Sequence, residues 1–382
     1  MLFNFCSIPR FISADSHVDP QPSMWGERIE KGFRDRAPRL EEREEGRFLV
    51  FEGNSQRISG LSSVAGKKSE DYDHESEGRR RGGWDPDARI HDQDLDNVAA
   101  EVLYGGSAIL NTKDRELRGA LSRAYNDWLA DFCASHPSRL IGIGEIPMWD
   151  IDLAIAEARR LREKGLRGVL IPSIPTIEGP WSTPADRNYT DPWYEPLWSA
   201  LEDLDLSVNM HLGARPLTEG LDYKQNAMIA IVCNKAMMAE PITSFIFSGV
   251  LQRHPRLKVV SVESGVGWMA FLVQWMDAVF EKHRHWTKSP LTEPPSFYFH
   301  RQVLGTFIED PVGVNERHVI GLGNIMWSND YPHADSTWPH SRKSVEEHFA
   351  GVPDEERNQI CAGNAAALYG IDLALANGGK AG

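Results

Sequence analysis

The chain has 382 residues, of which 41% are hydrophobic and 25% are charged, and its formal net charge is -14 at pH 7. These values are typical of a globular protein with a sizeable core, and the acidic balance disfavours nucleic acids and anionic membranes as partners, since both require a basic face. Four cysteines lie far apart with no C-x-x-C pair, and no apolar run reaches membrane length. We therefore expect a cytoplasmic protein with reduced thiols.

The first predicted strand lies in residues 11–20, where polar and apolar side chains alternate. Alternation places three ionisable side chains, Asp15, His17 and Asp19, on one face of the strand. A buried strand seldom carries three such groups unless a partner neutralises them, because an unpaired buried charge is costly or titrates away. A divalent metal ion is the simplest partner of this kind.

A segment unlike the rest of the chain follows, and we expect an insertion at about residues 44–83. Residues 47–59 predict a β-hairpin that turns at Gly53 and Asn54. Residues 60–83 are charged and rich in glycine, with little to bury, which indicates a loop or lid. We expect one domain over residues 1–382, interrupted by this insertion.

From Trp84 onward, short apolar segments alternate with helical patterns. Seven further strands are predicted at residues 99–104, 139–147, 166–172, 206–212, 257–263, 302–308 and 324–330. Helices are predicted at residues 114–135, 151–164, 193–204, 226–250, 266–286, 340–349 and 354–376. Eight such units predict an α/β fold, a (β/α)8 TIM barrel with its active site at the carboxyl ends of the strands. An open doubly wound sheet is the alternative, but no glycine-rich nucleotide loop follows the first strand.

Four of these strands end in side chains of the kinds that bind metals. Besides the first strand, His211 ends the fifth, Glu263 the sixth and Asp330 the eighth. Each has an ordinary structural interpretation, as a core histidine, a helix cap and a turn residue respectively. Because strand ends converge at one mouth of a barrel, their shared position favours a site for a divalent ion with an open position for water or substrate.

The sequence resembles the amidohydrolase-related family, which includes aminocarboxymuconate semialdehyde decarboxylase, resorcylate-type decarboxylases and some C–C hydrolases. The resemblance covers most of the chain. It is carried by DSHV at residues 15–18, GWDPDAR at 83–89 with Asp94, HLG at 211–213, VESGVGW at 262–268 and SNDYPH at 328–333. The family has a (β/α)8 barrel with a single divalent metal, so the resemblance implies the same for this chain.

By similarity, the metal ligands are His17, His211, Asp330 and a first-strand carboxylate. Many relatives have His-x-His in that strand, whereas this chain offers Asp15 and Asp19 around His17. We favour Asp15, with Asp19 as an additional ligand or a neighbour of the ligands. Zinc is the first expectation for the ion, manganese and iron are alternatives, and a second metal is left open.

The residue at the end of the sixth strand guides the prediction of the reaction. Many decarboxylating relatives have a histidine there, whereas this chain has Glu263, and a glutamate beside a metal-bound water can serve as a general base. We therefore predict a metal-dependent hydrolase that attacks a C–C or C–N bond of a small carboxylated or carbonyl substrate, with Glu263, Asp330 and His333 as catalytic residues. Non-oxidative decarboxylation of an aromatic or unsaturated acid is the close alternative. A dinuclear iron-type oxygenase and a non-catalytic partner subunit are further alternatives.

Two arginines, Arg215 and Arg301, are predicted to bind the substrate, because a guanidinium group can hold a carboxylate bidentately. An ordinary salt bridge is the competing interpretation for both. The resemblance also leads us to expect a homodimer or larger assembly, with a hetero-oligomer as an alternative.

Overall fold

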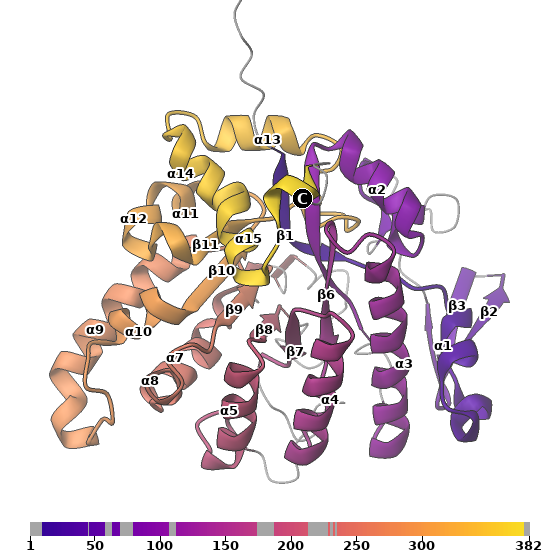
Figure 1. Ribbon diagram of the computed structural model, residues 1–382, viewed down its shortest axis with the longest axis horizontal. Coiled ribbons are helices and arrows are strands. Elements are labelled where there is room, and N and C mark those ends of the chain that lie inside the picture. The colour runs from indigo at the N-terminus through magenta and orange to yellow at the C-terminus, as the bar shows by residue number, and fades with distance from the viewer. Residues whose placement is uncertain are drawn as a thin grey trace, which may run out of the picture.

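Eight parallel strands form the central sheet of the molecule, with helices packed around it (Figure 1). The structure is a computed structural model that describes residues 10–44, 46–57, 63–68, 79–106, 112–173, 187–212, 228–229, 232–233 and 235–377. The strands, in the order in which they neighbour one another, are β1 Phe11–His17, β5 Val98–Tyr104, β6 Leu140–Glu145, β7 Gly168–Ile171, β8 Ser207–His211, β9 Val259–Val262, β10 Val303–Phe307 and β11 Ile325–Trp327. Each overlaps a range predicted from the sequence, and the predicted TIM-barrel fold is confirmed.

The barrel is nearly closed between its first and last strands. Within the described ranges, no regular ladder of hydrogen bonds joins β11 to β1. Instead, two backbone hydrogen bonds join β1 to the segment that follows β11. The amide of Asp330 donates to the carbonyl of Asp15 over 3.1 Å, and the amide of His17 donates to the carbonyl of Tyr331 over 2.6 Å. The segments that carry Asp15, His17 and Asp330 therefore lie side by side at the seam.

An irregularity in β1 modifies the predicted alternation. Ser13 pairs with Glu101 and Ser16 with Leu103 on β5, so β1 contains one extra residue between these pairs. As a result the hydroxyl oxygens of Ser13 and Ser16 lie 2.9 Å apart on one side. Asp15 and His17 stay together on the side that faces the mouth of the barrel.

Both faces of the barrel strands are buried, and each face contributes to a separate hydrophobic cluster. The smaller cluster combines alternate strand residues, such as Ile12, Ile143 and Val260, with side chains of the C-terminal helices. The larger cluster lies between the strands and the surrounding helices and includes Trp198, Phe245 and Trp327. Each fully buried aliphatic or aromatic side chain contributes roughly 1.5–3 kcal/mol.

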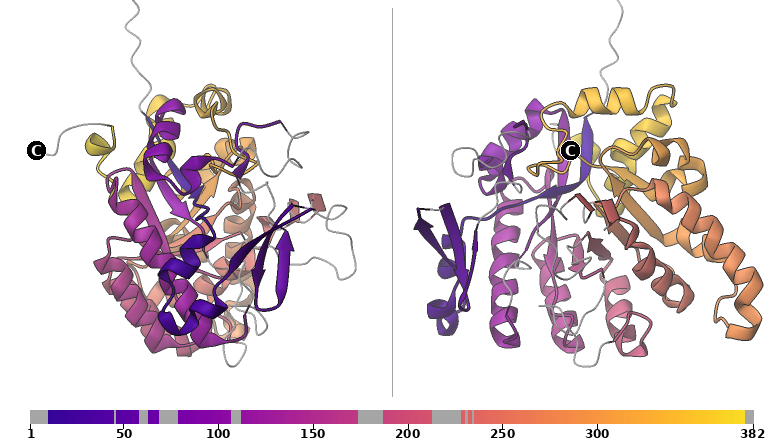
Figure 2. Two further views of the ribbon diagram at one scale, coloured as in Figure 1. Left: turned by 90° about the vertical axis from the view of Figure 1, so that its right-hand side faces the viewer. Right: turned by 180° about the vertical axis from the view of Figure 1, so that it is seen from behind.

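The helices surround the sheet (Figures 1 and 2). They are α1 Ser23–Arg28, α2 Pro86–Leu95, α3 Arg115–Ala134, α4 Ile151–Glu163, α5 Glu195–Asp203, α7 Ala239–Phe247, α8 Val250–Arg253, α9 Gly267–Thr287, α10 Pro295–Gln302, α11 Pro311–Asn315, α12 Arg317–Ile320, α13 Ser341–His348, α14 Asp354–Asn358, α15 Asn364–Tyr369 and α16 Leu373–Ala376. Short 3-10 turns span Lys31–Arg36, Arg81–Gly83, Pro192–Tyr194 and Leu322–Asn324, and a π-helix spans Gln359–Gly363. Aspartate caps start α2, α3 and α4, as the local sequence favours.

Some helices differ from the prediction. The single helix predicted over residues 354–376 is divided by the π-helical turn and by Gly370, whose φ of 64° ends α15. The prediction misses α2 and α10, which are short and begin with proline, and also α11 and α12. Part of the helix predicted over residues 226–250 lies outside the described residues, and its described portion contains α7 and the start of α8.

A separate antiparallel sheet lies beside the barrel near α1 (Figures 1 and 2). It consists of β2 Arg39–Arg43, β3 Gly46–Phe51 and β4 Asn54–Arg57. The last two strands form the predicted hairpin, with Gly53 in the turn at φ 77°. The strand β2 begins ahead of the expected start of the insertion, and most of residues 58–78 lie outside the described residues.

None of the helices in the described ranges combines the length and apolarity that a membrane span requires.

Candidate metal centre

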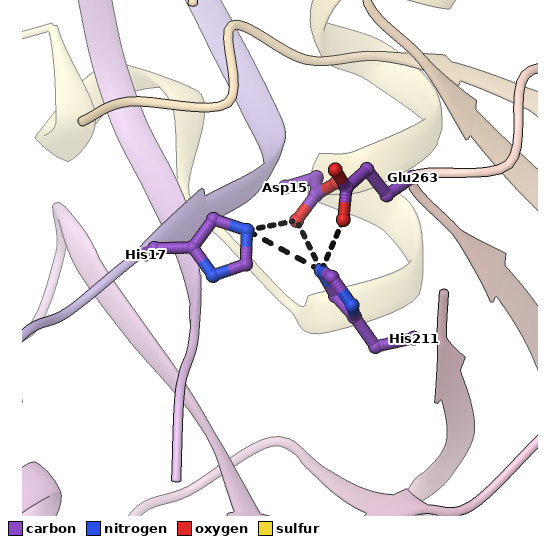
Figure 3. Close-up of side chains that lie close together, drawn as sticks. All are labelled: Asp15, His17, His211 and Glu263. Atoms are coloured by element: carbon purple, nitrogen blue, oxygen red, sulfur yellow. Dashed lines mark hydrogen bonds and ion pairs between the residues drawn. The ribbon is translucent and has the colours of Figure 1, made fainter. Parts of the chain in front are cut away.

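Side chains from three strand ends meet at the carboxyl end of the barrel (Figure 3). Asp15 and His17 come from β1, His211 ends β8, and Glu263 directly follows β9. The Nε2 atom of His211 lies 3.3 Å from Nε2 of His17 and 3.1 Å from Oε2 of Glu263. The Oδ1 atom of Asp15 lies 3.6 Å and 3.7 Å from the same two histidine nitrogens. Four predicted residues are thus within coordinating reach of one point.

Asp330 and His333, which follow β11, form a second group with His17. The Oδ1 atom of Asp330 lies 3.0 Å from Nε2 of His17 and 3.1 Å from Nδ1 of His333. The rings of His17 and His333 stack with their centroids 3.7 Å apart. His17 therefore connects the two groups, and the structure places five of the predicted residues around it.

The hydrogen bonding of these residues fits a divalent metal. Asp15 is fully buried, and among the described residues neither of its carboxylate oxygens has a hydrogen-bond partner. An ionised carboxylate in that position is costly unless a cation faces it. His211 donates through Nδ1 to the carbonyl of Leu212 over 2.8 Å, which orients its Nε2 atom toward the cluster. Two imidazoles with carboxylates are a donor set for zinc, manganese or iron.

Glu263 and Asp330 adopt backbone conformations that non-glycine residues rarely adopt. Their φ angles are 61° and 53°, in the left-handed region. The amide of Glu263 is fixed by a 2.8 Å hydrogen bond to the hydroxyl of Thr306, and the amide of Asp330 by its bond to Asp15. Such strain costs on the order of 1–3 kcal/mol per residue and concentrates at functional sites.

Burial and crowding shift the pKa values of the histidines. Burial, together with neighbouring His333, lowers the pKa of His17 to about 4, so its imidazole is neutral at pH 7 and suited to bind a metal. For His211, burial acts to lower the pKa, but Glu263 and Asp15 outweigh it and raise the pKa to about 10. A metal bound at Nε2 of His211 would therefore displace a proton.

The pKa values of the carboxyl groups of Glu263 and Asp330 shift in opposite directions. Burial, and then the charge of Asp330, raises the pKa of Glu263 to about 8. For Asp330 burial also acts to raise the pKa, but His333 and His17 outweigh it and hold the pKa below its usual range. The result is one carboxyl group that retains a proton beside one that does not, which is the arrangement of many acid–base sites.

Two buried tyrosines, Tyr104 and Tyr369, lie close to the candidate metal ligands, and the sequence does not single them out as site residues. The ring of Tyr104 lies 5.7 Å from the ring of His211. Its hydroxyl donates to Oδ1 of Asn209 over 3.0 Å, and the hydroxyl of Tyr369 donates to the same oxygen over 2.8 Å. In the sequence, the one indication of these contacts is Asn209. Strand alternation places it two residues before His211 on the same face, so groups that bond to Asn209 lie near the site.

Two predicted residues, Asp19 and Arg301, are not brought to this cluster. Asp19 accepts a 2.6 Å hydrogen bond from Ser63 and pairs with Arg79, because β1 ends at His17 and its alternation stops there. Arg301 lies on α10, just before β10, and therefore at the opposite end of the barrel, where it donates to the carbonyl of Leu251 over 2.6 Å. The expected roles of Asp19 as a ligand and of Arg301 as a substrate contact are corrected accordingly. Arg215 lies outside the described residues.

A parallel barrel with imidazoles and carboxylates gathered at the carboxyl ends of its strands is the arrangement of a metal-dependent enzyme. The model of the family described as amidohydrolase matches residues 14–371. The chain therefore belongs to the amidohydrolase family, as the sequence motifs indicate.

Curated relatives are similar over most of the chain. A gamma-resorcylate decarboxylase from Rhodococcus jostii (strain RHA1) is 26% identical over 308 residues, which cover 75% of this chain and 88% of the relative. A 2-amino-3-carboxymuconate-6-semialdehyde decarboxylase from Dictyostelium discoideum is 31% identical over 301 residues, which cover 76% of this chain and 77% of the relative.

Solved structures share the fold. An amidohydrolase from Mycobacterium avium subsp. paratuberculosis K-10 superimposes with a TM-score of 0.75 at 19% identity, covering 95% of this chain and all of that one. A dihydroxybenzoic acid decarboxylase from Polaromonas sp. JS666, solved with manganese and 2-nitroresorcinol, gives a TM-score of 0.66 at 18% identity, covering 95% and 97%. At these identities the likeness establishes the fold alone.

Proposed function

We propose that the chain is a metal-dependent, non-oxidative decarboxylase of an aromatic or unsaturated carboxylic acid. The observation that carries the metal site is the buried Asp15 carboxylate, without a hydrogen-bond partner in the described part of the chain and facing two histidine nitrogens. The relatives from Rhodococcus and Dictyostelium, both named decarboxylases, support this reaction. They favour decarboxylation over the hydrolysis that Glu263 first indicated.

Asp15, His17, His211 and Asp330 are the proposed metal ligands. When bound, a divalent ion supplies a Lewis-acidic centre for a carboxylate and a neighbouring oxygen. We propose manganese in place of the expected zinc, because carboxylates are prominent in the donor set and because the Polaromonas decarboxylase structure holds manganese.

Glu263, Asp330 and His333 are the proposed proton-handling residues. Decarboxylation breaks the bond between the carboxyl carbon and the adjacent carbon, whose electron pair must then take up a proton. Nδ1 of His333 lies 3.1 Å from Oδ1 of Asp330, and Oε2 of Glu263 lies 3.1 Å from Nε2 of His211, so His333 and Glu263 each lie beside a proposed metal ligand. Proton transfer by a positioned side chain is worth about 10²–10⁴ in rate.

Product analysis in heavy-oxygen water tests the reaction. With 2,6-dihydroxybenzoate as the probe and manganese supplied, we expect carbon dioxide and an organic product that carries a solvent hydrogen but no solvent oxygen. Heavy oxygen in the organic product would show hydrolysis and would overturn the proposal. A panel of other ortho-hydroxy and unsaturated acids extends the test to the rest of the substrate class.

We propose a homodimer or larger assembly of single-domain chains, as in the initial expectation from family resemblance. Light scattering of the purified protein measures this directly, and a monomer at micromolar concentration would contradict it.

A further inference from the structure

The motif GWDPDAR at residues 83–89 places an arginine inside the protein. Asp85 caps α2 by accepting from the amides of Asp87 and Ala88, both over 3.0 Å, and Pro86 occupies the first helical turn. This start fixes the direction in which Arg89 leaves the helix. The Arg89 side chain is fully buried, which is unusual for a guanidinium group and requires that its donors be satisfied.

Arg89 contacts the backbone of both segments that carry proposed metal ligands. Its Nη1 donates to the carbonyl of His17 over 2.6 Å, and its Nη2 donates to the carbonyl of Tyr331, next to Asp330, over 3.3 Å. The Tyr331 carbonyl also accepts the amide of His17. One guanidinium group thus joins β1 to the chain after β11 at the seam where no regular ladder is found in the described residues.

Glu101 on β5 holds the guanidinium group in place. Its Oε2 accepts from Nε of Arg89 and, over 2.7 Å, from Nε2 of Gln93 one helical turn later. Its Oε1 accepts from Ser16 over 3.3 Å. The buried positive charge is therefore paired with a buried negative one, and the pair is fixed from α2, β1 and β5 at once.

The side of Arg89 away from Glu101 is also enclosed. The carbonyl of Gly82 accepts a further bond from Nη1 over 3.2 Å, and the ring of Tyr331 lies 4.5 Å from the guanidinium carbon. Only a planar group with several fixed donors can serve three carbonyls and a carboxylate together. A lysine ammonium has neither this planarity nor this reach.

We propose that Arg89 is a positioning residue that sets the spacing between His17 and Asp330, and thereby the affinity of the site for its metal. The inference rests on the metal-dependent function proposed above. It assigns Arg89 no contact with substrate or metal, because every contact described for it goes to other protein groups. The 3.0 Å separation of His17 Nε2 from Asp330 Oδ1 is the geometry that its removal would relax.

Two substitutions and a matched control test this role. Arg89→Lys keeps the charge opposite Glu101 and Arg89→Gln keeps a hydrogen-bond donor, whereas both lose the bridge between the carbonyls. Gln302→Ala is the control: Gln302 is also fully buried and donates to two carbonyls, those of His254 and Leu257, but at the amino end of the barrel. The dissociation constant for manganese is measured by chelator competition, and the visible spectrum of the cobalt(II)-loaded protein reports ligand geometry.

We expect both Arg89 variants to bind manganese about 10–100-fold more weakly, the range seen when partners of metal ligands are removed, and to shift the cobalt spectrum. Gln302→Ala is expected to keep the wild-type constant within about threefold even where it unfolds more easily. Folded Arg89→Lys with wild-type affinity and spectrum would overturn the inference. If both Arg89 variants fail to fold, Glu101→Gln replaces them, because it keeps the arginine but weakens the ion pair that holds it. Glu101→Gln should weaken manganese binding at least threefold. A smaller change in the dissociation constant for manganese would overturn the inference.

Failure of the Arg89 proposal and failure of the proposed function can be told apart by experiment. A wild-type protein that binds manganese but releases no carbon dioxide from any acid would overturn the decarboxylase and leave the role of Arg89 standing. A wild-type protein that binds no divalent ion would overturn both.

Discussion

At the scale of single residues, the two aspartates of the first strand region have different environments despite their similar position in sequence. Asp15 faces two histidine nitrogens, while Asp19 is bonded to Ser63 and Arg79. The sequence alone favoured Asp15 but could not exclude Asp19 as a further ligand, because the partners that bind Asp19 lie 44 and 60 positions further along the chain.

Substitution of each aspartate by asparagine tests this difference. Asp15→Asn should weaken manganese binding by more than about tenfold, because a charged ligand is lost, whereas Asp19→Asn should change it less than about threefold. Isothermal titration of the two purified variants measures both constants. Equal losses in the two variants would contradict the assignment of Asp15.

Asp96, which is not itself a proposed ligand, gives a residue-scale prediction for pH dependence. It is buried and accepts from Ser341 and Asn329, and burial raises its pKa to about 6. Its folded pKa lies above the unfolded value, so the folded state binds the proton more tightly. The stability that this proton contributes is present below about pH 4 and is lost as pH rises through 6.

The expected size of the effect is roughly 3 kcal/mol at most, from a shift of about two pKa units. Urea unfolding of metal-free wild type and Asp96→Asn at pH 4 and pH 7 measures it. The free energy of unfolding of the wild type, relative to the variant, should fall between these pH values. A difference that does not change with pH would contradict the raised pKa.

At the scale of elements, the strands were predictable and several helices were not. Barrel strands such as Val259–Val262 are apolar on both faces, so they stand out as short apolar runs. The segment PSFYFHRQ of α10 lacks a clear apolar stripe and is held by tertiary packing against α9 and α7. The position of Arg301 was predictable from the barrel itself, because a residue that precedes its strand lies at the end opposite to the active site.

The 3-10 turn Arg81–Gly83 packs closely against the seam of the barrel. A Cβ atom at Gly82 would lie 2.7 Å from the hydroxyl of Tyr331, 3.1 Å from Asp92 and 3.2 Å from the backbone of Arg89. Gly82→Ala should therefore lower the free energy of unfolding by about 1–3 kcal/mol, as overpacking does. Urea denaturation measures the change.

Gly26 in α1 is the matched control, since a Cβ atom there meets nothing within 4 Å. Gly26→Ala should leave stability unchanged or raise it by up to about 1 kcal/mol, because alanine favours the helix. If Gly82→Ala were as well tolerated as Gly26→Ala, the close packing at the seam would be refuted.

At the scale of the whole molecule, folding brings into one small volume carboxylates that lie between 67 and 315 residues apart in the chain. Asp15, Glu263 and Asp330 lie near one another, and the fold must offset their repulsion when no cation is bound. The barrel supplies this convergence, which explains why strand-end residues could be predicted from sequence. The contacts of Arg89 and Tyr369 depend on packing between distant elements and could not.

Metal binding should therefore stabilise the whole fold. Manganese at 100 times its dissociation constant should add about 2.7 kcal/mol to the free energy of unfolding and raise the melting temperature by a few degrees. Differential scanning calorimetry with EDTA and with manganese measures the shift. The Asp15→Asn variant should show little increase in melting temperature on addition of manganese. An increase equal to that of the wild type would indicate that the ion binds elsewhere.

The central claim is that one divalent ion lies among Asp15, His17, His211 and Asp330, and anomalous diffraction from crystals grown with manganese tests it most directly. We predict a single anomalous peak at the carboxyl end of the barrel, about 2.0–2.3 Å from the nitrogen and oxygen atoms of these side chains. No peak at that position, or a peak bound by other residues, would contradict the account.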